Sequence, residues 1–217
     1  MTELLTLTLN PVQENTYVLY DTETREAIIF DPGCYTPAEE RQLQGLIETH
    51  TLKPVKLINT HCHFDHIFGN AFVKQTYGLE LGLHELEAPI LEAAPMVVNM
   101  YGMAPMTPSP PADYFIKEGD VIELGEARLE VLLCPGHSPG SLCFYNRGEA
   151  YLIAGDVLFH RSIGRTDLPG GDHKTLIRSI KNKLMPLPDN VRVYPGHGEP
   201  TTIGEERREN PFFSELS

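Results

Sequence analysis

The chain has 217 residues, 41% of them hydrophobic, and a formal net charge of −13. A chain of this length buries roughly 70% of its unfolded surface on folding and needs no disulfide scaffold. Its acidic surface would repel phosphate backbones, which argues against nucleic acid as a partner. The sequence has no apolar run near the ~20 residues that cross a bilayer, so no membrane association is expected.

Ten short strands are predicted from alternating or continuous apolar runs that end at turn residues. In chain order they lie at 5–9, 17–19, 27–30, 55–59, 79–83, 121–124, 128–133, 142–145, 151–153 and 191–194. Turn residues at 10–11 and 21–22 separate the first three strands. The chain is therefore expected to open with antiparallel strands.

Four helices are predicted from apolar residues spaced three and four apart. They lie at 37–51, 67–77, 85–93 and 175–184, and Asp172 is the expected N-cap of the last. Residues 95–111 are rich in Pro, Met and Tyr and show little periodicity. We expect a long loop there, acting as a lid that contacts an apolar part of the substrate or a partner subunit.

Strand groups and helices occur in both halves of the chain, which predicts an α/β fold. The favoured arrangement is a four-layered αββα sandwich, although the same periodicity fits other α/β sandwiches. No linker, low-complexity tract or fixed-period repeat divides the sequence. A single domain over residues 1–217 is therefore predicted.

A dense histidine cluster follows the apolar strand at 55–59. Its residues are Thr60, His61, Cys62, His63, Phe64, Asp65 and His66. Imidazole nitrogens and carboxylate oxygens suit zinc, iron and manganese. Alternating side chains would bring His61 and His63 together, with Asp65 and His66 directed to a neighbouring position. A solvated histidine-rich loop is the plain alternative, but a cluster just after a buried strand favours a site.

Three more candidate ligands stand beside glycines at the ends of apolar strands, where small residues allow close approach: His137, Asp156 and His197. The full set of candidate metal ligands is His61, His63, Asp65, His66, His137, Asp156 and His197. Seven donors are too many for one tetrahedral ion, but fit two ions that share a carboxylate and a water-derived oxygen. We predict two divalent metal ions per chain, zinc first, with iron or manganese as alternatives.

These motifs together resemble the metallo-β-lactamase superfamily. More closely, the chain is similar to the short hydroxyacylglutathione hydrolases of the glyoxalase II type, and the segments 164–173, 194–204 and 206–212 support that narrower match. The resemblance covers essentially the whole chain. The metal motif is specific for the superfamily and moderately specific for the substrate.

The resemblance implies three ligands for each metal and one that bridges them: His61, His63 and His137; Asp65, His66 and His197; and Asp156. A hydroxide between two cations is available at neutral pH, because the metals lower its pKa to ~7. It would attack the carbonyl of a small-molecule thioester, with Asp65 and Asp156 as the catalytic carboxylates. A thiolate leaves without a strong general acid, so thioester hydrolysis is the leading prediction.

Other functions stay open at this point. The similar persulfide dioxygenases use a single iron, which His61, His137 and Asp156 would bind, but the residues from 196 to 204 favour the hydrolase. A metal-binding scaffold without catalysis is a third possibility, and β-lactam hydrolysis a weaker one. Full-length glyoxalase II enzymes bind glutathione through an added C-terminal helical region, whereas about twenty residues follow His197 here.

For several further residues, an ordinary structural role is the alternative to a functional one. Asp31 is a turn former by default, and the resemblance implies that it supports a metal histidine. Cys62 is expected to pack in the core, and His160 to lie on the surface. Arg165 would meet a substrate carboxylate or pair with Asp167. The cysteines form no C-x-x-C pair and no secretory signal is present, so we expect reduced thiols and a cytoplasmic protein. The oligomeric state is left open.

Overall fold

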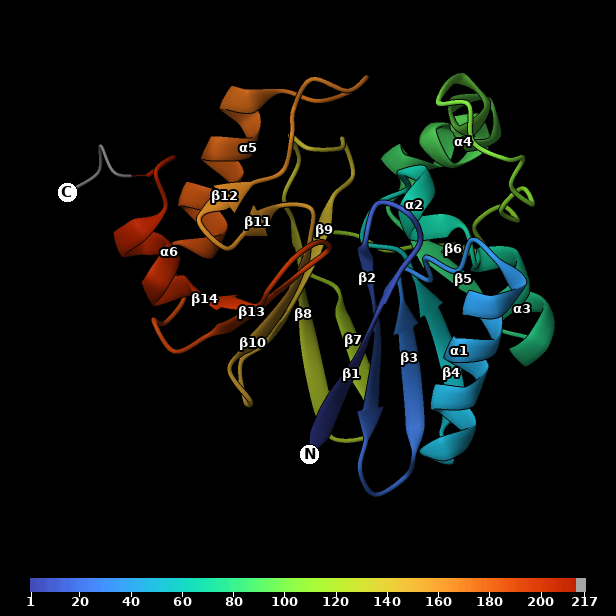
Figure 1. The fold of residues 1–217 in the computed structure, drawn as a ribbon. Coiled ribbons are helices and arrows are strands. Elements are labelled where there is room, and N and C mark those ends of the chain that lie inside the picture. Colours follow the sequence, from blue (N-terminus) through green and yellow to red (C-terminus); the bar gives the residue numbers. More distant parts are fainter. Residues whose placement is uncertain (214–217) are drawn as a thin grey trace. The chain divides into compact units, whose positions relative to one another are not determined.

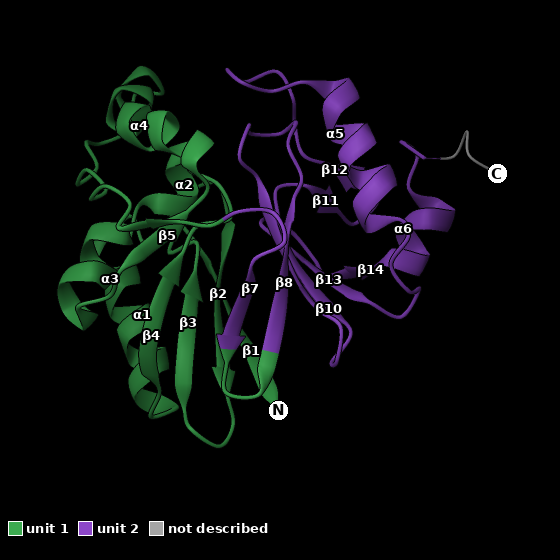
Figure 2. Cartoon of the chain, turned by 180° about the vertical axis from the view of Figure 1, so that it is seen from behind, with its two compact units in different colours: residues 1–116, 124–127 green, residues 117–123, 128–217 purple. Residues whose placement is uncertain are grey.

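The computed structural model describes residues 1–213, which divide into two compact units (Figure 2). Unit 1 contains residues 1–116 and 124–127, and unit 2 contains residues 117–123 and those from 128 onward. Each unit has its own sheet, helices and apolar core. The two units are described separately below.

Unit 1 is built on a six-stranded sheet in the order β1-β2-β3-β4-β5-β6. The strands are β1 (Thr2–Leu9), β2 (Glu14–Asp21), β3 (Glu26–Phe30), β4 (Lys53–Ile58), β5 (Leu81–Leu83) and β6 (Tyr114–Phe115). The pairs β1–β2 and β2–β3 are antiparallel, which confirms the predicted antiparallel start, and the later pairs are parallel. The ends of β3 and β4 and the start of β2 therefore share one edge of the sheet.

The helices of unit 1 cover one face of this sheet (Figure 1). They are α1 (Pro37–Thr49), α2 (Phe64–Ile67), α3 (Asn70–Tyr77), a 3-10 turn (Glu85–Glu87) and α4 (Ala88–Met100). A capping box between Thr36 and Glu39 begins α1. Leu43 of α1 and Val73 of α3 are fully buried in the same cluster as Leu57 of β4. This packing fixes the end of β4, from which the histidine segment leaves.

The helix predicted at 67–77 is in fact two helices. Its first turn begins at Phe64, inside the histidine segment, and α3 starts at Asn70. The break falls at Gly69, whose amide donates to the carbonyl oxygen of Pro32 at 2.7 Å. A Cβ at Gly69 would lie 2.9 Å from that same oxygen, so this close approach requires glycine. Asp65 is thus held on a helical turn rather than on a loop.

The loop predicted at 95–111 was placed too early, because α4 continues to Met100 with Pro95 inside it. A proline within a helix costs about 3 kcal/mol. Leu91, Ala94 and Val98 are buried on one face of α4, and burying them offsets that cost. The irregular segment therefore begins at Tyr101.

Unit 2 is built on a second sheet, in the order β14-β13-β10-β9-β8-β7. The strands are β7 (Val121–Leu124), β8 (Ala127–Leu133), β9 (Leu142–Asn146), β10 (Tyr151–Gly155), β13 (Arg192–Pro195) and β14 (Thr201–Thr202). Since β9 is antiparallel to β8 and β10, and β10 is parallel to β13, strands β8, β10 and β13 run in one direction. Their carboxyl ends lie at one edge of the sheet. A short hairpin of β11 (Leu158–Phe159) and β12 (Ser162–Ile163) follows β10.

Two helical segments pack against one face of this sheet (Figure 1). They are α5 (His173–Ser179), which continues as a π-helical turn (Ile180–Leu184), and α6 (Ile203–Glu209). Asp172 caps α5 as predicted, with its Oδ1 accepting the amide of Thr175 at 2.7 Å. The sequence analysis missed α6, because Ile203 is its sole apolar side chain and gives no periodicity.

The structure confirms the predicted α/β class, since helices and strands alternate in unit 1 and combine in unit 2. The single domain over residues 1–217 stays a prediction. Within residues 1–213, no helix is both long and apolar enough to cross a membrane.

Candidate metal centre

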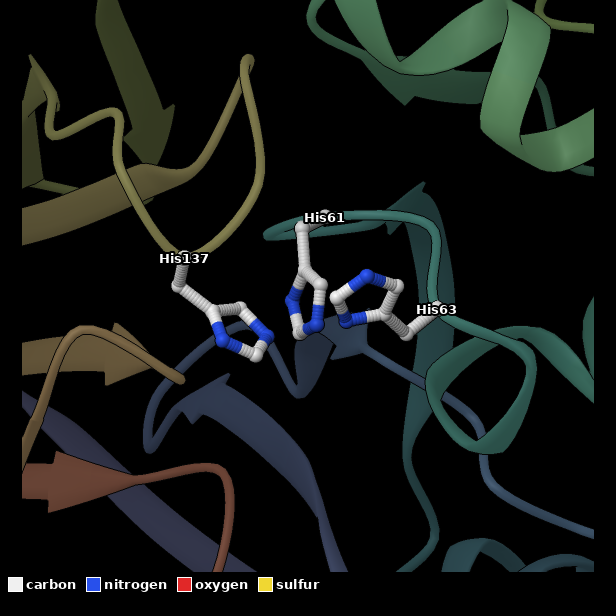
Figure 3. Close-up of side chains that lie close together, drawn as sticks. All are labelled: His61, His63 and His137. Atoms are coloured by element: carbon white, nitrogen blue, oxygen red, sulfur yellow. The ribbon is translucent and has the colours of Figure 1, made fainter. Parts of the chain in front are cut away.

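The histidine segment of unit 1 crowds three imidazole rings together. His61 and His63 lie in the loop between β4 and α2, and their ring centroids are 4.8 Å apart, edge to face (Figure 3). His66 lies in α2, and its ring centroid is 4.1 Å from that of His61. Figure 3 also draws His137, which belongs to unit 2. The expected approach of His61 and His63 is observed, and His66 lies closer still to His61.

Buried Asp31 orients two of these imidazoles from the end of β3. Its Oδ2 lies 3.1 Å from Nδ1 of His66, and it also accepts the hydroxyl of Thr60 at 2.6 Å. Because that hydroxyl gives its proton to Asp31, it accepts the Nδ1 proton of His61, 3.2 Å away. Both imidazoles thus carry the proton on Nδ1 and leave Nε2 to coordinate a metal. Asp31 has the supporting role that the resemblance implied.

Unit 2 collects its three donors from three strand ends. His137 follows β8, Asp156 follows β10 and His197 follows β13. The Oδ2 atom of Asp156 lies 3.5 Å from Nε2 of His137 and 3.5 Å from Nε2 of His197. The Nδ1 atom of His137 is 2.8 Å from the carbonyl oxygen of Arg165, so this ring too directs Nε2 toward Asp156. The topology brings together residues that are far apart in sequence.

The spacing of these donor atoms fits divalent ions. Two ligands about 2.1 Å from a tetrahedral zinc ion are about 3.4 Å apart. In unit 1, Nε2 of His66 lies 3.5 Å from Oδ2 of Asp65, which matches both pairs of unit 2. Each unit therefore presents imidazole and carboxylate groups at metal-binding spacing.

Two buried glutamates that the sequence analysis missed brace the donors of unit 1. Glu87 is fully buried, and its Oε2 accepts the amide of Cys62 at 2.8 Å, which fixes the loop between His61 and His63. Glu14 is also fully buried; its Oε2 accepts the Thr16 hydroxyl and its Oε1 lies 3.9 Å from Nδ1 of His66. Burial raises the pKa of Glu14 well above its usual value. No sequence motif marks either residue.

The segment after β12 braces the donors of unit 2. A Cβ at Gly164 would overlap the carbonyl oxygen of Asp156 and come within 3.0 Å of Nδ1 of His137. Arg165 pairs with Asp167 through two contacts, 2.7 and 2.8 Å long. The guanidinium holds the pKa of Asp167 at about 2. The loop-bracing ion pair, one of the two roles considered for Arg165, is present.

Other residues singled out in the sequence have the ordinary structural roles expected of them. Cys62 is fully buried in the core of unit 1, as expected. His160 is surface-exposed, with Nε2 3.1 Å from Oε1 of Glu205. Near the irregular segment, Met100 is 77% exposed, and the ring of Tyr101 packs 5.4 Å from that of Phe64, beside His63. The role of this segment as a lid stays a prediction.

Comparisons with known proteins show which sequences this chain is similar to. Residues 9–197 match the model of a family described as the metallo-beta-lactamase superfamily. The hydroxyacylglutathione hydrolase GloC of Haemophilus influenzae is 38% identical over 206 residues, which cover 94% of this chain and 95% of that protein.

Solved structures are similar over nearly the whole chain. The B3 metallo-beta-lactamase BLEG-1 is 41% identical, with a TM-score of 0.89, 98% of this chain covered and 100% of that one. The di-iron-bound form of TTHA1623 is 38% identical, with a TM-score of 0.86, 96% of this chain covered and 99% of that one. These matches confirm the predicted fold class.

Proposed function

Since this chain belongs to the metallo-β-lactamase superfamily, we propose that it is a metal-dependent thioester hydrolase of the hydroxyacylglutathione hydrolase type. That it is a metal-binding hydrolase follows from the family and from donors at metal-binding spacing in each unit. The substrate class is the proposed part. It is supported by the identity to GloC over nearly the full length of both chains.

In this proposal the seven donors hold two divalent ions. The first ion takes three histidines, the second takes an aspartate and two histidines, and one aspartate bridges them: His61, His63 and His137; Asp65, His66 and His197; and Asp156. When bound, two such cations lower the pKa of a shared water to ~7 and polarise the substrate carbonyl. The metal is proposed to be zinc, with iron as the alternative that the di-iron-bound relative supports.

The chain's own residues then orient the donors. Asp31 accepts the Nδ1 proton of His66 and, through Thr60, fixes that of His61. The carbonyl oxygen of Arg165 does the same for His137. With these tautomers fixed, the Nε2 atoms of His61, His66 and His137 would be available to hold a cation without reorganisation when substrate binds. The thiolate of a thioester leaves without a general acid, and this mechanism assigns none.

The observation that carries the two-metal centre of this proposal is the repeated 3.5 Å spacing around carboxylates. It occurs at Asp65 in unit 1 and twice at Asp156 in unit 2. Asp156 has an imidazole nitrogen on each of two neighbours at this distance, which supports a bridging role. An enzyme with a single iron ion would need only some of the seven donors.

The test is hydrolysis of S-D-lactoylglutathione by protein loaded with zinc or iron, followed by loss of thioester absorbance. We expect turnover that a chelator abolishes and added metal restores, with two metals per chain by elemental analysis. Absence of turnover in protein that holds two metals would overturn the thioester proposal. One iron per chain, with oxygen consumed on a glutathione persulfide, would favour the dioxygenase instead.

A second candidate function is β-lactam hydrolysis, because BLEG-1 is a B3 metallo-beta-lactamase and is 41% identical. The same protein preparation is assayed with nitrocefin beside the thioester. We expect the kcat/KM for the thioester to exceed that for the β-lactam. The opposite ranking would make β-lactam hydrolysis the main activity.

Location and partners are also proposals. All four cysteines are buried, free thiols. This supports a reducing compartment and hence the cytoplasm, where disulfides are rare. The acidic net charge of −13 supports a small-molecule substrate rather than nucleic acid as the partner.

A further inference from the structure

Glu206 is a fully buried carboxylate at the centre of a hydrogen-bond cluster in unit 2. Its Oε2 accepts the backbone amide of Arg161 at 2.9 Å and the side-chain amide of Asn210 at 2.7 Å. Its Oε1 accepts the hydroxyl of Thr201 at 2.6 Å. A buried carboxylate is tolerated only when donors surround it. Here the donors come from the β11–β12 hairpin, β14 and the end of α6.

The hairpin that Glu206 binds needs to be held in place. Its turn residue Arg161 has a φ of 55°, in the left-handed region that disfavours side chains. Such a conformation persists only where its surroundings impose it. Glu206 holds the amide of Arg161, and Asn210 donates to the carbonyl oxygen of Ser162 at 3.0 Å. Both sides of the turn are thus fixed from α6.

This hairpin and β14 both adjoin the candidate metal ligands. The hairpin starts two residues after Asp156, and its Phe159 ring meets His197 edge to face, with centroids 6.3 Å apart. His197 lies in the short connection between β13 and β14, the strand that contains Thr201. One carboxylate therefore binds both segments that present Asp156 and His197.

We propose that Glu206 is a positioning residue for the metal centre. By joining the hairpin and β14 to α6, it keeps the imidazole of His197 at coordination distance from Asp156. The inference rests on the proposed function only in assuming that these two residues bind metal. Glu206 performs this role as a hydrogen-bond acceptor and not as a charge partner, since its three donors are a backbone amide, a side-chain amide and a hydroxyl.

Three variants separate this role from general effects of charge. Glu206→Ala leaves three buried donors without their acceptor. In Glu206→Gln, the carboxamide oxygen still accepts from Arg161 and Asn210, while its NH₂ group donates to Thr201. Glu209→Ala is the matched control, because Glu209 lies on the same helix and pairs with the exposed guanidinium of Arg161.

The first measurement is zinc affinity of each purified protein by competition with a chromophoric chelator. A residue that orients a metal ligand typically contributes 10–100-fold to affinity. We expect Glu206→Ala to weaken binding of one zinc ion by about tenfold or more, while Glu206→Gln and Glu209→Ala stay within about twofold of wild type. Unchanged affinity in Glu206→Ala, or equal losses in the Gln and Ala variants, would overturn the proposal.

The second measurement needs no metal and separates this proposal from the proposed function. Amide hydrogen exchange of metal-free protein, read by mass spectrometry, should be faster at 155–163 and 196–202 in Glu206→Ala than in wild type or Glu209→Ala. Equal exchange in these segments would overturn the proposal, whether or not the wild type binds zinc. A wild type without zinc affinity would instead refute the metal centre itself.

If Glu206→Ala does not fold, Phe159→Leu tests the same path. This change removes the ring that contacts His197 and leaves the contacts of Glu206 in place. We expect weaker zinc binding with unchanged exchange at 160–163. Wild-type affinity in a folded Phe159→Leu protein would overturn the proposed path from Glu206 to His197.

Discussion

The two units supply their proposed metal ligands in opposite ways. Unit 1 provides four of the seven from one segment, 61–66, where a loop passes directly into a helical turn. Unit 2 provides one ligand from each of three strands, at positions 137, 156 and 197. Local chain geometry sets the first group, whereas sheet topology sets the second. The second group therefore depends on loops that must be held separately.

The supports differ in the same way. In unit 1 buried side chains contact the ligands themselves, as Asp31 does with His66. In unit 2 the supports involve the backbone of loops: the carbonyl oxygen of Arg165 accepts from the His137 ring, and Glu206 accepts the backbone amide of Arg161 in the hairpin after Asp156. Ligands in unit 1 should therefore respond to changes in single side chains, and those in unit 2 to changes in loop geometry.

The largest effect is expected from Asp156→Ala, which removes the carboxylate that His137 and His197 both face. Loss of a residue that only orients a ligand costs roughly 10–100-fold in affinity or activity. Loss of this shared ligand should cost more, in both metal content and kcat. Elemental analysis and the thioester assay measure it, with Glu209→Ala as the control. Full activity in the Asp156→Ala protein would show that the centre is misassigned.

A smaller effect is expected from Asp31→Asn, which tests the direct support in unit 1. The new NH₂ group would face either the backbone amide of Thr60, if it replaces Oδ1, or the hydroxyl of Thr60 and the Nδ1 proton of His66, if it replaces Oδ2; all three donate to Asp31. We expect about 10–100-fold weaker metal binding and a loss of about 1–3 kcal/mol in the free energy of unfolding.

Chelator competition and urea unfolding measure the two effects of Asp31→Asn. Asp21→Asn is the matched control, because Asp21 is a buried turn acceptor at the opposite end of the sheet of unit 1. It should lower stability without changing metal affinity. Equal metal affinities in both variants would remove Asp31 from the support of His66.

The contrast between the units also explains what the sequence could predict. The donors of segment 61–66 could be predicted together without knowledge of the sheet topology, because they are neighbours in the chain. His137, Asp156 and His197 were found because each follows an apolar strand beside a glycine. The strand direction that brings them to one edge depends on pairings such as β10 with β13, which no local pattern encodes.

The residues and elements that the sequence did not predict also have a physical explanation. Nothing in the sequence around Glu87 and Glu206 distinguishes them from glutamates on the surface. Only tertiary packing buries them. The proline-rich composition from residue 95 onward predicts a loop, whereas the buried apolar contacts of α4 outweigh the cost of Pro95 inside the helix. The early turn at Phe64 depends on the distant carbonyl oxygen of Pro32, which holds Gly69. Short-range propensity carries no information on any of these contacts.

A third prediction compares the helix caps of the two units. Thr36→Ala and Asp172→Ala each remove a side-chain cap, which costs about 1 kcal/mol of stability. The backbone amide of Asp172 also donates to the carbonyl oxygen of Gly136, beside His137. We therefore expect a similar fall in thermal stability for both variants, but weaker metal binding only for Asp172→Ala. Identical metal affinities would contradict the dependence of unit 2 on loop geometry.

The smallest effect concerns pH. Arg165 lowers the pKa of Asp167 from 3.8 to about 2. A lowered folded-state pKa stabilises the protein above the unfolded value, and this contribution is lost as the pH falls from about 4 to about 2. Both side chains are more than half exposed, so the stabilisation is small. Carboxyl carbon NMR titration should place the Asp167 midpoint near 2, and at a higher pH in Arg165→Ala; equal midpoints would refute the ion pair.

The four buried thiols give each unit its own internal reporter. Burial raises the pKa values of Cys62 in unit 1 and Cys143 in unit 2 well above the usual range, so neither reacts while its unit stays closed. A thiol reagent would modify each cysteine at the rate at which its surroundings open. Mass-resolved labelling kinetics thus compare the opening of the two units within one molecule, without a dye or an engineered label. A cysteine introduced on the surface would also be labelled selectively against this silent background.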